Sequence, residues 1–275
     1  FKDLIGQETL VRTLSNSITK NRIAHAYLLT GVRGIGKTTT ARLIAMSLNC
    51  QNRTESIYEP CGECNSCISV REDRNLDVIE MDAASKTGVD DIREIIDNVK
   101  YRPLDSKYKI FIIDEVHMLS KNAFNALLKT LEEPPSHVKF IFATTEVKKI
   151  PITIISRCQR FDLHRIEKEK LTFYLFEIAE KEKITIDKDA VSLLVRSADG
   201  SMRDGLSLLD QANASDIEKI TSHSIIEMLG LADRGNIFDL FDAILSGNAP
   251  DALRIYNRIY KAGADVVMIF DELLN

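Results

Sequence analysis

The chain has 275 residues, which is enough for one large domain or for two or three smaller ones. Hydrophobic residues make up 44% and charged residues 28%, and no run approaches the roughly 18 to 20 apolar residues of a membrane span. The formal net charge is −5, so any contact with nucleic acid must come from a local basic patch. We therefore expect a cytoplasmic protein with no membrane partner. Because the sequence starts at Phe1 and stops inside an apolar helical pattern, we also expect a fragment of a longer protein.

Strand and helix patterns alternate in the first part of the chain. Apolar runs predict strands at residues 26–30, 76–81, 109–113 and 138–143, with one more short strand within 150–163. Helical spacing of apolar residues predicts helices at residues 7–20, 38–48, 89–99 and 120–133. The segment 49–75 has neither pattern and is expected to be irregular. This alternation is typical of an α/β fold, so we expect a five-stranded parallel sheet with helices on both faces.

Strand signals vanish after about residue 167. Helical patterns follow one another to the end of the sequence, at residues 168–182, 187–198, 201–213, 221–229, 236–246, 250–262 and from 265. Gly230 suggests a further boundary within this helical part. We therefore expect three domains: an α/β domain at 1–166 with an insert at 49–70, an all-α domain at 167–230, and the truncated beginning of another all-α domain at 231–275.

A glycine-rich loop at residues 31–38 organises the chain. Its sequence, Gly-Val-Arg-Gly-Ile-Gly-Lys-Thr, matches the G-x-x-x-x-G-K-T pattern between a predicted strand and a predicted helix. The backbone N–H groups of such a P-loop, with the helix dipole, bind phosphate. We expect Lys37 to reach the β- and γ-phosphates of ATP and the Thr38 hydroxyl to ligate Mg²⁺. The residues expected to bind the nucleotide are Gly31, Gly34, Ile35, Gly36, Lys37, Thr38 and Thr39.

Two carboxylates, Asp114 and Glu115, follow the predicted strand 109–113. At the carboxyl edge of the sheet, Asp114 could hold Mg²⁺, and Glu115 suits a general base that acts on water. Together with the P-loop, this pair predicts an ATPase. His117 completes a string that is similar to a helicase DExH box, but the helical remainder supplies no second RecA-like domain. We expect His117 to be structural rather than catalytic.

Polar residues that follow the later predicted strands are weaker evidence for an ATPase site. Thr144 and Thr145 end the strand expected beside that of Asp114, where a hydroxyl can orient the attacking water, although threonines are common at strand ends. Arg157 lies at the far rim of the same domain and could act as an arginine finger on a neighbouring subunit's γ-phosphate. From this residue alone, a solvated arginine is the favoured interpretation.

Two predicted helix starts carry further candidates. Arg203 could close on bound nucleotide, or it could pair with Asp204 or Asp199. Lys86 and Thr87 precede the helix at 89–99, where donors can contact a DNA phosphate. An ordinary N-cap by Thr87 explains the same residues and is favoured on the sequence alone.

Four of the five cysteines lie in the insert, as C-x10-C-x2-C-x2-C at Cys50, Cys61, Cys64 and Cys67. In a reducing compartment this spacing predicts a closed tetrahedral zinc site, with disulfides as the alternative. Four protein ligands leave no open position, so we expect a structural ion. Cys158 is left over as a lone buried thiol.

Taken together, these motifs resemble one family, the gamma/tau ATPase subunits of the bacterial sliding-clamp loader of DNA polymerase III. The matching stretches cover about residues 1–213 and are FKDLIGQE, HAYLLTGVRGIGKTTTAR, the cysteine insert, DAASKTGVDDIR, IFIIDEVHMLSKNAFNALLKTLEEPP, FATTEVKKIPITIISRCQRF and GSMRDGLSLLDQ. The resemblance implies an AAA+ module with a helical lid and a collar domain. It also implies a hetero-pentameric loader that uses ATP to open the sliding clamp and load it on primed DNA, with contacts to the replicative polymerase made by regions outside this chain.

The resemblance assigns roles by position. It implies zinc binding by the four cysteines and leaves some adenine contacts unassigned, because the family's basic segment before FKDLIGQE is absent here. The other roles that it implies are sensors at Thr145 and Arg203, a trans finger at Arg157, adenine contacts at Ile5 and Met202, and DNA-phosphate contacts at Lys86 and Thr87.

Alternative functions remain to be separated. A related AAA+ motor, such as a branch-migration helicase or a helicase loader, fits the P-loop, but the zinc insert and the Ser-Arg-Cys motif around Arg157 argue against it. A scaffold that does not hydrolyse ATP is disfavoured by the intact Lys37, Thr38, Asp114 and Glu115. Small-molecule kinases share the P-loop but fit the paired carboxylates and the helical tail poorly.

Overall fold

The structure is a computed structural model that describes residues 4–20, 22–54, 59–86, 88–214, 219–229 and 234–261. The chain divides into two compact units, residues 1–166 and residues 167–275. In the described part of the chain, no helix is both long and apolar enough to cross a lipid bilayer. Thr87 and Gly230, which were singled out in the sequence, lie outside the described residues.

A five-stranded parallel sheet forms the centre of the first unit, as predicted from the sequence. In the order β2-β3-β4-β1-β5, its strands are β2 (Val78–Asp82), β3 (Lys109–Asp114), β4 (Val138–Thr144), β1 (Ala26–Thr30) and β5 (Gln159–Asp162). Thr30 of β1 pairs with Thr144 of β4, and β3 is the other neighbour of β4. The residues that follow β1, β3 and β4 therefore emerge side by side at the carboxyl edge of the sheet.

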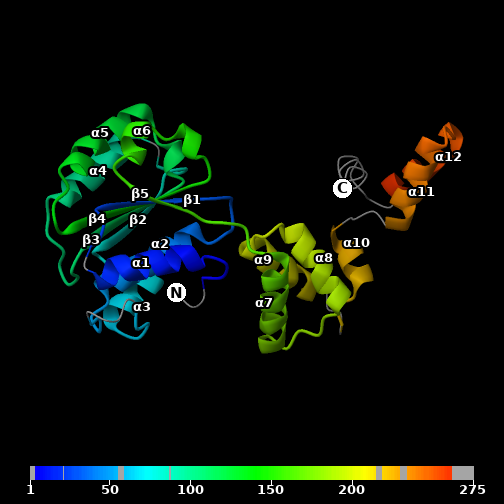
Figure 1. The fold of residues 1–275 in the computed structure, drawn as a ribbon, viewed down its shortest axis with the longest axis horizontal. Helices are drawn as coiled ribbons and strands as arrows, with labels where there is room; N and C mark the ends of the chain where they lie inside the picture. The colour runs from blue at the N-terminus through cyan, green and yellow to red at the C-terminus, as the bar shows by residue number, and fades with distance from the viewer. Residues whose placement is uncertain are drawn as a thin grey trace. The chain divides into compact units, whose positions relative to one another are not determined.

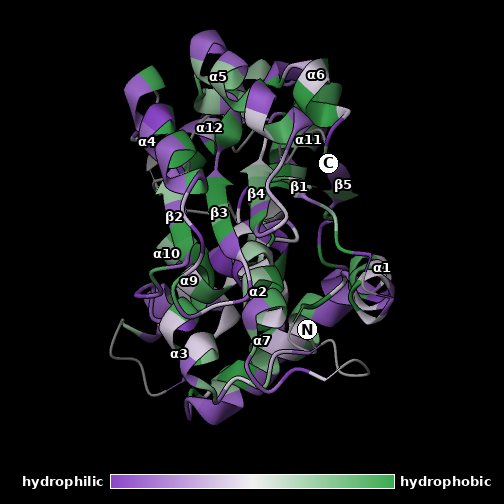
Figure 2. Cartoon of the chain, turned by 90° about the vertical axis from the view of Figure 1, so that its left-hand side faces the viewer, coloured by the Kyte–Doolittle hydropathy of each residue, from purple (hydrophilic) through white to green (hydrophobic). Residues whose placement is uncertain are grey.

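Helices cover both faces of this sheet, which confirms the predicted layers (Figure 1). One face carries α1 (Glu8–Thr19), α2 (Lys37–Asn49) and α3 (Asn65–Arg71). The other face carries α4 (Val89–Val99), α5 (Lys121–Glu132) and α6 (Ile152–Ile155). In Figure 2, α4 and α5 show mixed hydrophobic and hydrophilic colouring, as expected for helices with one face on the sheet and one in water.

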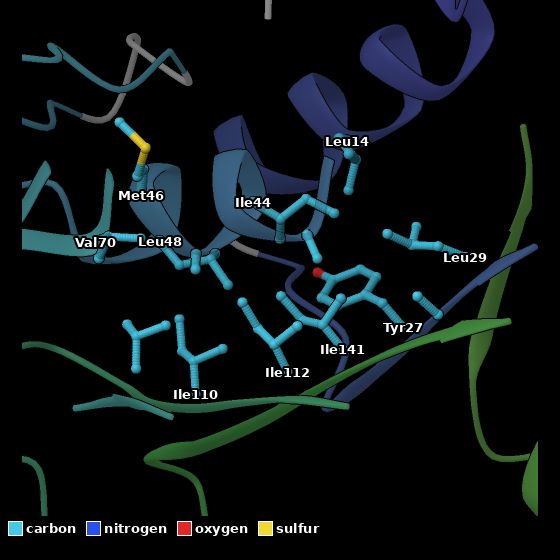
Figure 3. Packing of buried hydrophobic residues seen from close by; sticks show 14 of the residues in the cluster. Leu14, Tyr27, Leu29, Ile44, Met46, Leu48, Val70, Ile110, Ile112 and Ile141 are labelled. Carbon is cyan, nitrogen blue, oxygen red and sulfur yellow. The ribbon is translucent and has the colours of Figure 1, made fainter. Parts of the chain in front are cut away.

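Side chains alternate between two cores because successive strand residues point to opposite faces. Tyr27, Ile110, Ile112 and Ile141 point to the α1–α2 side, where they face Ile44 and Leu48 of α2 (Figure 3). The opposite core is mostly aliphatic and also contains the stacked rings of Phe111, Phe140 and Phe142. Strands buried on both faces read as continuous apolar runs, which is why they were visible in the sequence.

The structure differs from the sequence-based expectation in the cysteine insert. The prediction of an irregular segment is wrong for residues 65–71, which form α3. The backbone N–H of Cys67 donates to the sulfur of Cys64, so a cysteine serves as the N-cap of this short helix. Strand β2 also begins later than predicted, at Val78, because Asn75 and Asp77 form a turn before it.

The second unit is built of helices, as predicted. Its described helices are α7 (Lys168–Lys181), α8 (Lys188–Ala198), α9 (Met202–Asn213), α10 (Ser222–Leu229), α11 (Arg234–Leu245) and α12 (Ala249–Lys261). Buried residues of α7, α8 and α9 include Leu175, Leu194 and Leu209. Helices α11 and α12 share a small core of their own around Leu240 and Ile259.

Candidate functional site

The loop between β1 and α2 has the backbone that its glycines permit. Gly31, Gly34 and Gly36 have φ values of +146°, +78° and +91°. A Cβ on Gly31 would lie 2.7 Å from the Leu163 carbonyl oxygen, so this glycine is required by close packing as well as by its backbone angle. Helix α2 starts at Lys37 without a side-chain cap, which leaves its first N–H groups directed at the loop.

Lys37 lies within this loop, with only 6% of its surface exposed. Its ammonium group donates to the carbonyl oxygens of Gly31, at 3.1 Å, and Val32, at 3.0 Å. These bonds hold a buried cation where the N–H groups of the loop and of α2 also point. Such a concentration of positive charge is suited to a phosphate chain.

The first turn of α2 is joined to the end of β3. Thr38 Oγ1 donates to Asp114 Oδ2 at 2.5 Å, and Asp114 Oδ1 accepts the backbone N–H of Glu115 at 2.8 Å. A hydroxyl and a carboxylate side by side are the oxygen ligands that Mg²⁺ prefers. The expected pair of metal ligands therefore lies together beside the loop.

Glu115 has a strained backbone and a restrained carboxylate. Its φ of +44° is rare for a residue with a side chain, and such outliers gather at functional sites. Its Oε2 atom accepts the backbone N–H of Thr145 at 3.2 Å and the Thr145 hydroxyl at 3.1 Å. The pairing of β3 with β4 thus brings together the predicted base and the predicted sensor.

His117 belongs to the same network, which the sequence did not indicate. Its Nδ1 atom lies 3.0 Å from Thr144 Oγ1 and 3.3 Å from Glu115 Oε2, and its Nε2 atom lies 3.4 Å from Glu146 Oε1. Glu115 is close along the chain, but Thr144 and Glu146 are about thirty residues away, at the end of β4 and just beyond it. The Asp-Glu-Val-His string is the one signal in the sequence that places His117 near Glu115, and the sequence alone predicts a structural rather than a catalytic role for His117.

The remaining nucleotide candidates of the first unit surround the loop. Ile35 is buried in the core and Thr39 is exposed at the start of α2. Ile5 is half-buried, two residues before Gln7, whose side-chain amide pairs with the backbone N–H and carbonyl of His164. Since Leu163 packs against Gly31, Ile5 belongs to the same edge of the unit as the P-loop.

The arginine candidates have different surroundings. Arg157 is held within its own unit, where its guanidinium donates to the Thr153 carbonyl and to Glu132, both at 2.6 Å. It is therefore ordered rather than freely solvated. Arg203, in the second unit, is exposed beside the half-buried Met202, and no ion pair of Arg203 is found among the described residues.

The DNA-phosphate candidates lie at the start of α4. Lys86 is exposed, and its backbone N–H donates to Asp82 in the turn after β2. The expected N-cap at Thr87 is wrong, because the structure places Gly88 at this position with its N–H donating to the Asp91 carboxylate. Asp91 sits at N3 and accepts the N–H of the N-cap residue, which is the N3 half of a capping box.

The four cysteines of the insert converge. The sulfur atoms of Cys50, Cys61, Cys64 and Cys67 all lie within 4.8 Å of one another, and none of the four forms a disulfide. Tetrahedral thiolate ligation at about 2.3 Å requires sulfurs about 3.8 Å apart, so the cluster can hold a metal ion. Backbone N–H groups of Glu63 and Cys64 lower the pKa of Cys61 to about 6, which favours the thiolate.

The fifth cysteine, Cys158, lies outside the metal-ligand cluster. Cys158, expected to be a lone buried thiol, is half-buried against the core formed with α4, α5 and α6. Burial raises the pKa of its thiol to about 12, so it stays protonated at neutral pH. It is a packing residue.

Three protein-family models together match nearly the whole chain. Residues 6–167 match the family described as DNA polymerase III, delta subunit. Residues 170–215 match the ATPase lid domain of the DNA polymerase III clamp loader subunit, and residues 220–275 match domain III of DNA polymerase III subunits gamma and tau.

Known relatives agree with these models. The chain is 46% identical to DNA polymerase III subunit gamma of Buchnera aphidicola subsp. Acyrthosiphon pisum, over 100% of this chain and 75% of that protein. It is 44% identical to subunit tau of Salmonella typhimurium and 43% identical to subunit tau of Bacillus subtilis, again over 100% of this chain. The chain spans only 42% and 48% of the lengths of those two proteins.

Solved structures support the fold. The Holliday junction branch migration motor RuvB of Thermotoga maritima superposes with a TM-score of 0.60 at 18% identity, over 100% of this chain and 88% of that one. At this identity the similarity concerns the AAA+ fold alone. The P-loop, the paired carboxylates, the family models and the relatives lead to one assignment: the chain belongs to the gamma/tau family of DNA polymerase III subunits, the AAA+ ATPase subunits of the bacterial clamp loader.

Proposed function

We propose that this chain is the ATP-hydrolysing part of a clamp-loader subunit, which uses ATP to open a sliding clamp and load it on primed DNA for DNA polymerase III. The observation that carries this proposal is the convergence of Lys37, Thr38, Asp114 and Glu115 at one sheet edge, in a chain of the gamma/tau family. The family models favour this function over branch migration, since the similarity to RuvB is limited to the fold.

Each residue of the site has a distinct role in ATP hydrolysis. The loop N–H groups and Lys37 bind the phosphates, and Thr38 with Asp114 would hold Mg²⁺, which offsets phosphate charge when bound. Glu115 takes a proton from water while the water oxygen bonds to the γ-phosphorus and the bond from that phosphorus to the bridging oxygen breaks. ADP and phosphate are the products.

The other site residues complete the proposal. Thr145 and Arg203 act as sensors of the γ-phosphate, and Ile5 and Met202 contact adenine. Arg157 serves a neighbouring subunit in trans, so that its contact with the phosphate depends on assembly. Lys86 and Thr87 contact DNA phosphates.

The assembly follows from the same proposal. We place the nucleotide site in domain 1–166, the lid in 167–230 and the start of the collar in 231–275. The partners are the other subunits of a hetero-pentamer, the sliding clamp and primed DNA. Zinc in the four-cysteine cluster is structural, because four thiolates leave no position for a substrate.

The experiment that tests this proposal measures phosphate release by the full-length subunit. The rate is compared with and without partner subunits, sliding clamp and primed DNA, and Lys37→Ala serves as the inactive control. We expect stimulation only when all components are present. A rate indifferent to clamp and primed DNA would favour a different AAA+ motor, and no turnover under any condition would favour a scaffold.

A further inference from the structure

His117 is a polar side chain enclosed at the catalytic edge of the sheet. Only 6% of its side chain is exposed, although imidazole is readily hydrated. The ring lies between two carboxylates, with Nδ1 at 3.3 Å from Glu115 Oε2 and Nε2 at 3.4 Å from Glu146 Oε1. A buried ring with a polar partner at each nitrogen has a fixed orientation.

The ring also contacts the end of β4, through the same Nδ1 atom that faces Glu115. Thr144 Oγ1 accepts the backbone N–H of Glu146 at 3.0 Å and lies 3.0 Å from His117 Nδ1. A hydrogen bond from Lys149 and, to a smaller extent, the charges of Lys149 and His117 lower the pKa of Glu146, so this partner is ionised at neutral pH. The ring is therefore held by a second strand and does not depend on Glu115 for its position.

The contacts of Glu115 are one-sided. In the described part of the chain, its Oε2 atom accepts both Thr145 donors and faces His117 Nδ1, whereas Oε1 has no hydrogen bond or ion pair. A carboxylate rotates readily about its last side-chain bond. With three polar atoms around one oxygen, that rotation is restrained and the other oxygen is presented to water.

We propose that His117 is a positioning residue for ATP hydrolysis: with Thr145 it fixes Oε2 of Glu115, so that Oε1 is the oxygen that takes the proton from the attacking water. This inference rests on the proposed function, because it takes Glu115 as the base. His117 itself exchanges no proton with water and contacts no nucleotide.

The test compares two amide substitutions of His117, by Asn and by Gln, which place a polar group at different positions of the former ring. Asn places a polar atom where Nδ1 lies and keeps the contact with Glu115, whereas Gln reaches the Nε2 position and keeps the contact with Glu146. For His117→Ala we expect kcat to fall about tenfold, a part of the 10²–10⁴ that a general base supplies. KM for ATP stays within about twofold, since binding does not involve Oε1. His117→Asn recovers most of kcat and His117→Gln does not.

The assay is ATP turnover by the full-length subunit in its assembly, with binding of a fluorescent ATP analogue measured in parallel. His137→Ala is the matched control, because His137 is half-buried at the opposite end of β4 and, in the described part of the chain, its side chain has a hydrogen bond only with the Val99 carbonyl. Unchanged kcat in His117→Ala, or equal kcat in the Asn and Gln variants, would overturn the inference. If His117→Ala does not fold, the comparison of Asn with Gln decides alone.

Glu115→Gln separates this inference from the proposed function. If that variant retains full turnover, Glu115 is not the base, and both the role of His117 and the mechanism fail. If it abolishes turnover while the His117 variants keep the wild-type kcat, the mechanism stands and only the positioning role is lost.

Discussion

Two glycines of the P-loop offer a matched test of the loop geometry. Gly31 and Gly36 both have positive φ values, +146° and +91°, so alanine at either position costs about 1–3 kcal/mol of backbone strain. The two positions differ in the room that surrounds an added side chain. An added Cβ at Gly31 would lie 2.3 Å from Ile35 Cδ1 and 2.7 Å from the Leu163 carbonyl oxygen, whereas at Gly36 it would meet nothing within 4 Å.

The clash at Gly31 sets the size of the expected difference. The Ile35 side chain can rotate away, but the Leu163 carbonyl belongs to the backbone that continues β5, and overpacking of this kind costs about 1–3 kcal/mol. Gly31→Ala should therefore destabilise the chain by about 2 kcal/mol more than Gly36→Ala, or by about 4–8 °C in Tm for a unit of this size.

Differential scanning calorimetry of the two variants measures this difference directly. The melting transition of the first unit is the relevant one, since both glycines belong to it. Equal losses of Tm in the two variants would show that Leu163 does not press on Gly31. A stable Gly31→Ala variant would refute the loop geometry itself.

Three further predictions follow from other parts of the chain. Arg157→Ala should preserve ATP binding but abolish DNA-stimulated turnover in the assembled complex, which a phosphate-release assay with a nucleotide-binding control measures; full stimulation would remove the trans role. Chelation or Cys64→Ser should release about one zinc ion per chain, as measured by mass spectrometry, and lower Tm; an unchanged Tm would refute a structural ion. Burial opposes ionisation of Asp77, but N–H donors of Leu104, Asp105 and Ser106 outweigh it and lower its pKa. The stability that Asp77 contributes is therefore present above the unfolded-state pKa of about 3.9 and is lost as the pH falls through the lower folded-state pKa. Urea midpoints between pH 2 and 6 should show this loss in the wild type and in the exposed control Asp97→Asn, but not in Asp77→Asn.

The sequence predicted what depends on local pattern. Buried parallel strands form apolar runs, and the P-loop and the Asp114–Glu115 pair are contiguous motifs, so their positions followed directly. Helix α3 was missed because seven residues that include a cysteine metal-ligand candidate show no clear helical period. Its N-cap is a thiol, which is not among the usual capping residues.

Contacts between distant strands could not be predicted in the same way. The partners of His117 lie at the end of β4, and Glu132, which binds Arg157, lies at the end of α5. Each contact depends on the register of elements that are far apart in the sequence. For this reason the sequence alone could not indicate the contacts that His117 makes with the end of β4 or that Arg157 makes with Glu132.

The residues that follow β5 connect the edge of the P-loop with the second unit. The N–H of Leu163 donates to the carbonyl oxygen of Thr30, immediately before the loop. The side-chain amide of Gln7 forms hydrogen bonds with both the N–H and the carbonyl of His164. The second unit begins at residue 167, only a few residues further on. The backbone that leads into the second unit is thus hydrogen-bonded to the residue immediately before the phosphate-binding turn.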